Sequence, residues 1–169
     1  MASGTSTDGA RHLERVRLDI SPIDRQLFIA ARPQSGDAPE VIARGVRLVL
    51  NMIPTPTPSG LRSAPLQAVW LPWLDTARLP LPIWLLRRGT QAAVEALQRG
   101  EGVLTYCREG RHRSVAMACA ILVAHGMTAE QAMTRVKEAR PVADPEAAHV
   151  AAVVRKFEAF WNDGHRGRP

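Results

Sequence analysis

The chain has 169 residues, of which 46% are hydrophobic, and this supports one globular domain with a single hydrophobic core. No apolar run is long enough to cross a bilayer, and the N-terminus lacks the basic and then apolar pattern of a secretory signal. We therefore expect a cytoplasmic protein with no integral membrane segment. The formal net charge of +6 favours an anionic partner. Scattered arginines and an aromatic content of only 5% argue against nucleic acid as that partner.

The two ends of the chain are polar and show no periodic pattern of apolar residues. We expect flexible tails over residues 1–12 and 162–169, with one folded domain over residues 13–161 between them. Cys107 and Cys119 are the only cysteines, which is too few for a disulfide framework, and they lack the spacing of a zinc site. A free thiol in a reducing compartment is the consistent interpretation.

Five short stretches are rich in residues that favour β-structure. They cover residues 16–20, 27–29, 46–52, 68–71 and 103–106. Prolines interrupt residues 53–65 so often that we expect this segment to be an exposed loop without regular structure.

Proline and glycine mark the ends of the predicted helices. The expected segments are a short turn over residues 39–45 and helices over residues 84–99, 114–125, 128–139 and 144–161. Thr128 and Gln131 form a capping-box pattern, and Asp144 is expected to be the N-cap of the last helix. Together the elements predict an α/β domain with a central mixed sheet of about five strands and helices on both faces.

Residues 103–115 run from a predicted strand through a tight loop into a predicted helix. The start of a helix presents unpaired N–H groups and the positive end of the helix dipole, and both suit an anion. Gly110 allows the loop to curl so that successive N–H groups point inward. The loop residues expected to line this phosphate cradle are Arg108, Glu109, Gly110, Arg111 and His112.

Cys107 stands where the strand ends and is expected to face the cradle. The helix start and the nearby arginines should lower the pKa of its thiol, so that a nucleophilic thiolate is present near neutral pH. Arg113 can offer a planar fork to two phosphate oxygens. The motif therefore predicts a cysteine that attacks phosphorus and an arginine that holds the oxygens, with no metal or organic cofactor.

The pattern Cys-x-x-Gly-x-x-Arg-Ser after a strand and before a helix resembles the signature of the protein tyrosine phosphatase superfamily, and the dual-specificity branch fits best. The resemblance covers nearly the whole chain, including residues 18–29 and 49–52. It implies that Cys107 is the nucleophile, that Arg113 binds phosphate, and that the Ser114 hydroxyl helps the thiolate to leave the phosphocysteine. The implied function is hydrolysis of phosphotyrosine or phosphoserine/threonine in proteins.

Such a reaction also needs a carboxyl group that protonates the leaving oxygen and later takes a proton from water. Asp75 is our candidate, because it lies in a loop upstream of the cysteine, as the general acid of the family does. The weaker competitors are Asp24, Asp37 and Glu109. Cys119 follows the loop on an apolar helix and is expected to be a core residue.

The chain departs from the family pattern at Tyr106, where members usually carry a histidine. A phenol cannot become a cation, so we expect a less acidic Cys107 thiol than is usual and weaker catalysis. Arg108, Arg111 and His112 lie in the loop beside Arg113 and make it unusually cationic. Such loops resemble those of members that act on phosphoinositides and other lipid phosphates. The alternative substrate is therefore a phosphoinositide or another phospholipid headgroup, with peripheral contact to anionic lipid.

Three further functional classes share some of these features. A catalytically silent phosphate-binding module would keep the cradle, and Tyr106 is its only support. Rhodanese-like sulfur transfer also places a cysteine in an anion-binding loop, but the Arg-Ser ending and an upstream acid fit a phosphatase better. Arsenate reduction needs a resolving cysteine, and Cys119 on a buried helix is badly placed for that role.

Overall fold

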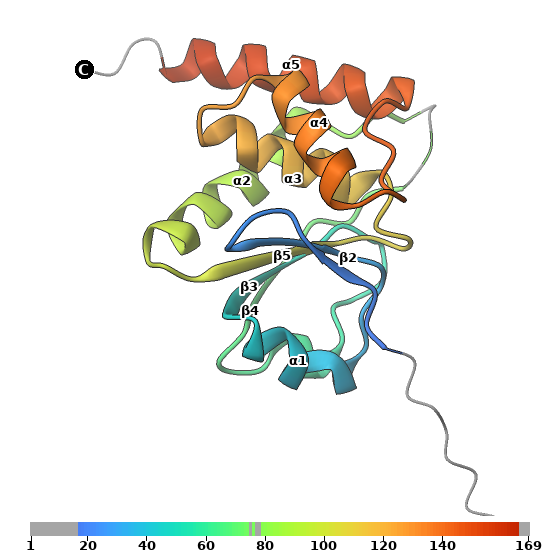
Figure 1. Ribbon diagram of the computed structural model, residues 1–169, viewed down its shortest axis with the longest axis vertical. Helices are drawn as coiled ribbons and strands as arrows, with labels where there is room; N and C mark the ends of the chain where they lie inside the picture. The colour runs from blue at the N-terminus through green and yellow to red at the C-terminus, as the bar shows by residue number, and fades with distance from the viewer. Residues whose placement is uncertain (1–16, 75, 77–78, 166–169) are drawn as a thin grey trace, which may run out of the picture.

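A five-stranded mixed sheet lies at the centre of the computed structural model, which describes residues 17–74, 76 and 79–165 (Figure 1). The strands are β1 (Ile20–Pro22), β2 (Leu27–Ala30), β3 (Val46–Asn51), β4 (Gln67–Trp70) and β5 (Gly102–Tyr106). They lie in the order β1-β2-β5-β3-β4, with β1 antiparallel to β2 and the other neighbours parallel. The predicted strands from β2 to β5 are confirmed to within one residue at each end.

The first predicted strand, over residues 16–20, is wrong in its position. Residues 17–19 are not in a strand, and β1 begins only at Ile20. Pairing explains the shift, because Ile20 lies opposite Ala30 and β2 ends there. A strand needs a partner for its N–H and C=O groups, so the apolar pattern alone did not fix where this one starts.

Helices cover both faces of the sheet, as the sequence predicted, with the short helix α1 (Ala38–Ala43) on one face and the other α-helices on the opposite face (Figure 1). The others are α2 (Ile83–Gln98), α3 (Arg113–Ala124), α4 (Ala129–Ala139) and α5 (Ala148–His165). The capping box of Thr128 and Gln131 at the start of α4 is confirmed. Helix α3 is buried from Arg113 to Val123, which explains why its sequence is apolar on every side.

The last helix differs from its prediction at both ends. Helix α5 begins at Ala148, so Asp144 is not its N-cap, and it continues to His165 beyond the predicted end at Trp161. Asp144 instead contacts Arg111, both through its backbone N–H, 3.0 Å from the Arg111 carbonyl oxygen, and through its carboxylate. The predicted N-terminal tail, residues 1–12, lies outside the described residues.

The proline-rich segment 53–65 is not the exposed, irregular loop that the sequence predicted. It contains the short 3-10 helix η2 (Ser59–Arg62), and its buried residues are Ile53, Thr57 and Leu61. A Cβ atom at Gly60 would collide with the carbonyl oxygen of Ser35 in the 3-10 helix η1 (Ser35–Asp37). Proline therefore prevented a strand or α-helix here, but the apolar side chains between the prolines still pack into the core.

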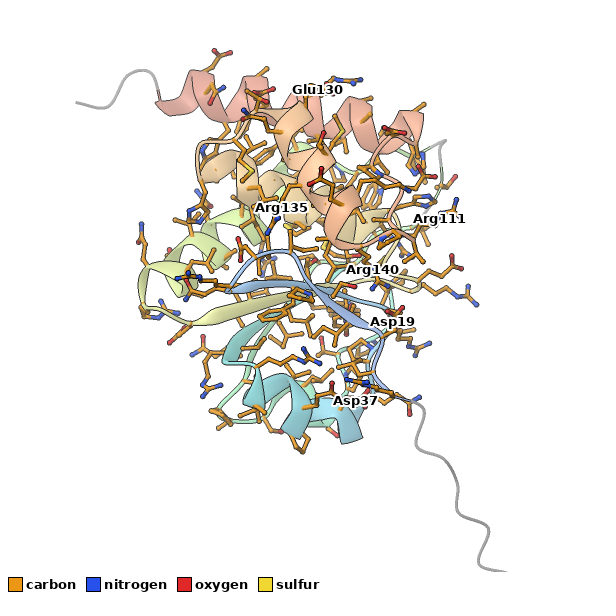
Figure 2. The ribbon with its side chains drawn as sticks, viewed as in Figure 1. Asp19, Asp37, Arg111, Glu130, Arg135 and Arg140 are labelled. Carbon is orange, nitrogen blue, oxygen red and sulfur yellow. The ribbon has the colours of Figure 1, made fainter. Side chains whose placement is uncertain are left out.

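One buried arginine joins distant parts of the fold. Arg140, at the end of α4, is only 1% exposed and makes a bidentate ion pair with Asp19 at 2.7 and 2.8 Å. It also donates to the Ser21 hydroxyl at 3.0 Å and to the carbonyl oxygens of Gly110 and Glu109 at 2.9 and 3.2 Å. Figure 2 shows Arg140 and Asp19 directed toward each other. The arginine thus connects the start of β1 to the loop after β5.

The ion pair predicts an acid-dependent stability. Hydrogen bonds from Arg140 hold the pKa of Asp19 below its ordinary value. The stabilisation is therefore complete above the ordinary pKa and is lost as the pH falls through the lowered one. We expect Asp19→Asn to reduce the free energy of unfolding at neutral pH by about 1 kcal/mol, a modest loss because the Asp19 side chain is 59% exposed.

Urea unfolding over a series of pH values measures this effect. The difference between the wild type and Asp19→Asn should shrink toward zero at the acid end. The control is Glu138→Gln, which changes an exposed carboxylate on the same helix as Arg140. A difference that stays constant with pH would contradict the expectation.

Candidate active site

The predicted cradle is the loop between β5 and α3, at the edge of the sheet where the parallel strands end. Strand β5 lies between β2 and β3, so the loop emerges from the middle of the sheet. Gly110 has φ of 64°, and a Cβ atom there would lie 2.6 Å from an Arg140 nitrogen and 2.9 Å from the Ala30 carbonyl oxygen. Only glycine satisfies both the left-handed backbone and this close packing.

Cys107 lies at the bottom of the loop and is 1% exposed. The Ser114 hydroxyl donates to its Sγ atom at 3.1 Å. Burial alone would raise the pKa of the thiol. The Ser114 hydroxyl, the backbone N–H groups of Ser114 and Arg111, and the positive charge of Arg113 outweigh burial, so the pKa of Cys107 lies below that of an ordinary thiol. The site therefore stabilises the thiolate relative to that of an ordinary cysteine.

Arg113 is the first residue of α3 and is only 7% exposed. One guanidinium nitrogen donates to the carbonyl oxygen of Trp73 at 2.7 Å and lies 3.4 Å from that of Met52. These two carbonyls come from the segments after β4 and β3. They hold the guanidinium beside the loop, where its charge lowers the pKa of Cys107.

The remaining loop residues differ in how they are held. The backbone carbonyls of Glu109 and Gly110 accept from Arg140. The Arg111 guanidinium contacts the Asp144 carboxylate at 3.2 Å, and His112 Nε2 lies 3.8 Å from the same carboxylate. Although burial would raise the pKa of Asp144, the hydrogen bond and charge of Arg111 lower it overall. The Arg111 side chain is thus paired with Asp144, in the segment that precedes α5.

Asp75, the predicted general acid, lies outside the described residues. Its neighbours Leu74 and Thr76 line a cavity of about 590 Å³ that also reaches Arg113. The two weaker upstream candidates make local turns instead. Asp24 accepts from the backbone N–H groups of Gln26 and Leu27, and Asp37 accepts from that of Gln34.

Tyr106, the residue before Cys107, is completely buried. Burial raises the pKa of its hydroxyl to about 12, against the smaller opposing effects of Thr57 and the positive charge of Arg32. The hydroxyl forms no hydrogen bond of ordinary length and angle within the described parts of the chain. Tyr106 is therefore a neutral core side chain here, next to the backbone that carries Cys107.

A second polar group supports the segment opposite the loop. Asn51, the last residue of β3, donates to the Thr55 carbonyl oxygen at 2.9 Å and to the Thr57 hydroxyl at 3.1 Å. Its own side-chain oxygen accepts from the N–H of Ile53 at 2.9 Å. These bonds shape the turn after β3, one of whose carbonyls contacts Arg113.

Sequence reasoning missed Arg140, Asp19 and Asn51 as parts of the site. Asp19 and Arg140 lie near opposite ends of the sequence, and no local motif relates an arginine at a helix end to a carboxylate before a strand. Asn51 offered a weak signal, because an amide at the end of an apolar strand is unusual in a buried element. Its partners could not be read from the sequence.

Cys119 is completely buried on α3, and burial raises the pKa of its thiol, as suits a core residue. Within the residues that the structure describes, no group of three or more His, Cys, Asp or Glu side chains is arranged to hold a metal ion. Among the described helices, none combines the length and the apolar character that a membrane crossing requires.

Profiles of known protein families give no match to the chain. Curated relatives include human and mouse dual specificity phosphatase 28, each 34% identical over 121 residues. The match covers 70% of this chain, 66% of the human protein and 72% of the mouse protein. The chain thus spans about two thirds of the length of the human relative.

Two solved structures have the same fold over most of the chain. A mouse putative dual specificity phosphatase in complex with zinc tungstate is 27% identical, with a TM-score of 0.79 and 96% of each chain covered. A variant of human dual specificity phosphatase 28 with one tyrosine replaced by histidine is 25% identical, with a TM-score of 0.77 over 86% of this chain and 98% of that chain. The fold, the loop geometry and the sequence relatives agree, and the chain belongs to the dual specificity phosphatase family.

Proposed function

We propose that the protein hydrolyses phosphotyrosine and phosphoserine/threonine in proteins through a phosphocysteine at Cys107. The main support is the bond from the Ser114 hydroxyl to the buried Cys107 sulfur, within a loop that ends at the phosphate-binding candidate Arg113. A hydroxyl donor and a nearby guanidinium stabilise a thiolate both as nucleophile and as leaving group.

In the first step, the Cys107 thiolate attacks phosphorus, a sulfur–phosphorus bond forms, and the bond from phosphorus to the substrate oxygen breaks. Loop N–H groups and the Arg113 guanidinium hold the three remaining oxygens, where negative charge is spread in the transition state. The leaving oxygen receives a proton from a carboxyl group, the role we assign to Asp75.

In the second step, water attacks the phosphocysteine and gives a proton to the same carboxylate. The sulfur–phosphorus bond breaks, inorganic phosphate is released, and the thiolate returns to its hydrogen bond with Ser114. Every proton and electron pair is accounted for by the side chains and water, and the sequence proposed here needs no metal ion.

The substrate class rests on the relatives. The curated relatives are named dual specificity phosphatases, and one solved relative holds tungstate, an oxyanion of similar shape to phosphate. We expect tungstate to occupy the loop of this protein as well and to inhibit it competitively, because tetrahedral oxygens would meet the same N–H groups and Arg113.

The first test compares the wild type with Cys107→Ser in the hydrolysis of a small aryl phosphate, with a metal chelator present. The wild type should turn over and the variant should lose activity by several orders of magnitude, because serine is a far weaker nucleophile at neutral pH. Activity that survives in the variant would contradict the phosphocysteine route.

Two outcomes would redirect the proposal. A wild type that binds tungstate but does not turn over would support the silent phosphate-binding module. Activity on phosphoinositide vesicles well above that on phosphopeptides would support the lipid alternative.

Ser114→Ala tests the role of the hydroxyl. Without this donor the pKa of Cys107 should rise, because burial would then be opposed by fewer groups. The acidic limb of the kcat/KM profile should move to higher pH. The loss in kcat should be roughly ten- to hundredfold, since a hydrogen bond to a charged group contributes about 1.5–3 kcal/mol.

Rapid mixing provides the distinguishing measurement for Ser114→Ala. Slow breakdown of the phosphocysteine should appear as a burst of aryl alcohol equal to the enzyme concentration. Ser114→Thr, which retains a hydroxyl, is the matched control and should restore part of the rate. Equal losses in both variants without a burst would indicate a packing defect only.

Tyr106→His tests the departure from the family pattern. An imidazole at this position can donate a hydrogen bond and carry a positive charge, so the pKa of the Cys107 thiol should fall and activity near neutral pH should rise severalfold. Tyr106→Phe should leave the thiol pKa nearly unchanged, because the phenol hydroxyl is not part of an ordinary hydrogen bond. Thiolate absorbance measured against pH gives both values, and an unchanged pKa in Tyr106→His would refute the interpretation.

A further inference from the structure

Beside the phosphate loop lies a cavity with more positive charge than a single phosphate requires. The cavity of about 590 Å³ is lined by Arg113 and by two further arginines, Arg32 and Arg108. Its apolar wall is formed by Ile53, Pro54 and Leu74. Within the described part of its lining there is no Asp or Glu. The site therefore presents two cations beyond the one assigned to the transferred phosphate.

Arg32 is fixed beside the loop by its backbone. It follows β2, and its N–H donates to the carbonyl oxygen of Arg108 at 3.2 Å, which ties the end of β2 to the residue after the nucleophile. Arg32 also precedes Pro33, and a residue before proline is restricted to extended conformations. The point at which its side chain leaves the backbone is thus set by the fold.

The two guanidinium groups remain available to a ligand. Arg32 and Arg108 are exposed, and neither side chain has an ion-pair partner within the ranges that the structure describes. The charge of Arg32 already reaches the buried hydroxyl of Tyr106, whose pKa it lowers against the effect of burial. Arg111 differs, because Asp144 pairs with it on the other side of the loop.

We propose that Arg32 and Arg108 form a second anion-binding subsite, which receives an acidic or phosphorylated residue next to the phosphorylated residue of a peptide substrate. This inference rests on the proposed function and adds to it a preference for substrates. The apolar wall would contact the carbon atoms of the phosphorylated side chain, and the arginines would contact the neighbouring anion. An apolar wall combined with a cationic rim suits a phosphorylated peptide side chain better than a phosphoinositide headgroup, because every ring carbon of the headgroup also carries a hydroxyl or phosphate group.

The test uses two phosphotyrosine peptides that differ only in the residues flanking the phosphotyrosine, glutamate in one and glutamine in the other. At low salt the wild type should have about fivefold higher kcat/KM for the glutamate peptide, the size expected for one exposed ion pair. Arg32→Gln should bring that ratio close to one. Its loss of activity on a small aryl phosphate should be much smaller, because that substrate has no second anion.

Arg135→Gln is the matched control, since it removes the same charge from an exposed position on α4, well away from Arg111 in Figure 2. It should leave the ratio between the two peptides unchanged. High salt should reduce the ratio in the wild type but not in Arg32→Gln. A wild-type ratio near one, or an equal fall in the ratio for Arg32→Gln and Arg135→Gln, would overturn the proposal.

Binding separates this inference from the proposed function. The Cys107→Ser protein cannot form a phosphocysteine, so fluorescence anisotropy with the same labelled peptides reports recognition without turnover. Tighter binding of the glutamate peptide, lost in Cys107→Ser/Arg32→Gln, would support the subsite even if the wild type proved inactive. A stronger preference of Cys107→Ser for vesicles with a phosphoinositide bisphosphate than for either peptide would overturn it.

Discussion

The shape of the loop between β5 and α3 depends on the buried guanidinium of Arg140. Its donors bind the carbonyl oxygens of Glu109 and Gly110 and so occupy these two acceptors of the loop. The N–H groups of Arg111 and Ser114 are then left to face the sulfur. A buried guanidinium needs a counter-charge, and Asp19 supplies it. One side chain therefore joins the first strand, the end of α4 and the loop that contains Cys107.

Burial and hydrogen bonding have opposite effects on the pKa of the Cys107 thiol. A sulfur that is almost fully buried would ordinarily be neutral, because charge is costly in a low-dielectric interior. The fold surrounds it with donors and with one guanidinium, and these outweigh the cost of burial. Cys119 is buried on the following helix, where burial outweighs one backbone hydrogen bond, and the pKa of its thiol is raised. The pKa values of the two thiols of one chain are thus shifted in opposite directions by their surroundings.

Local pattern was sufficient to predict the elements and the central motif. The apolar stretches predicted the bounds of four strands to within one residue. Cys107, Arg113 and Ser114 were predicted to lie together because they are close in the sequence. Features set by distant pairing were missed. The start of β1 depends on where β2 ends, the start of α5 depends on Asp144 contacting Arg111, and the segment with Gly60 depends on close packing against η1. Such contacts leave no periodic trace in the sequence.

The hydrogen bond from Arg113 to the carbonyl oxygen of Trp73 couples the guanidinium to the segment after β4. Trp73 stands two residues before Asp75 in the chain, and its oxygen lies 2.7 Å from the guanidinium. Any displacement of that segment must lengthen this bond or move the arginine with it. Binding of an oxyanion by the guanidinium would likewise act on this segment, which leads to Asp75, the proton donor that we propose. The anion site that we propose and the segment leading to Asp75 are thereby linked through the carbonyl oxygen of Trp73.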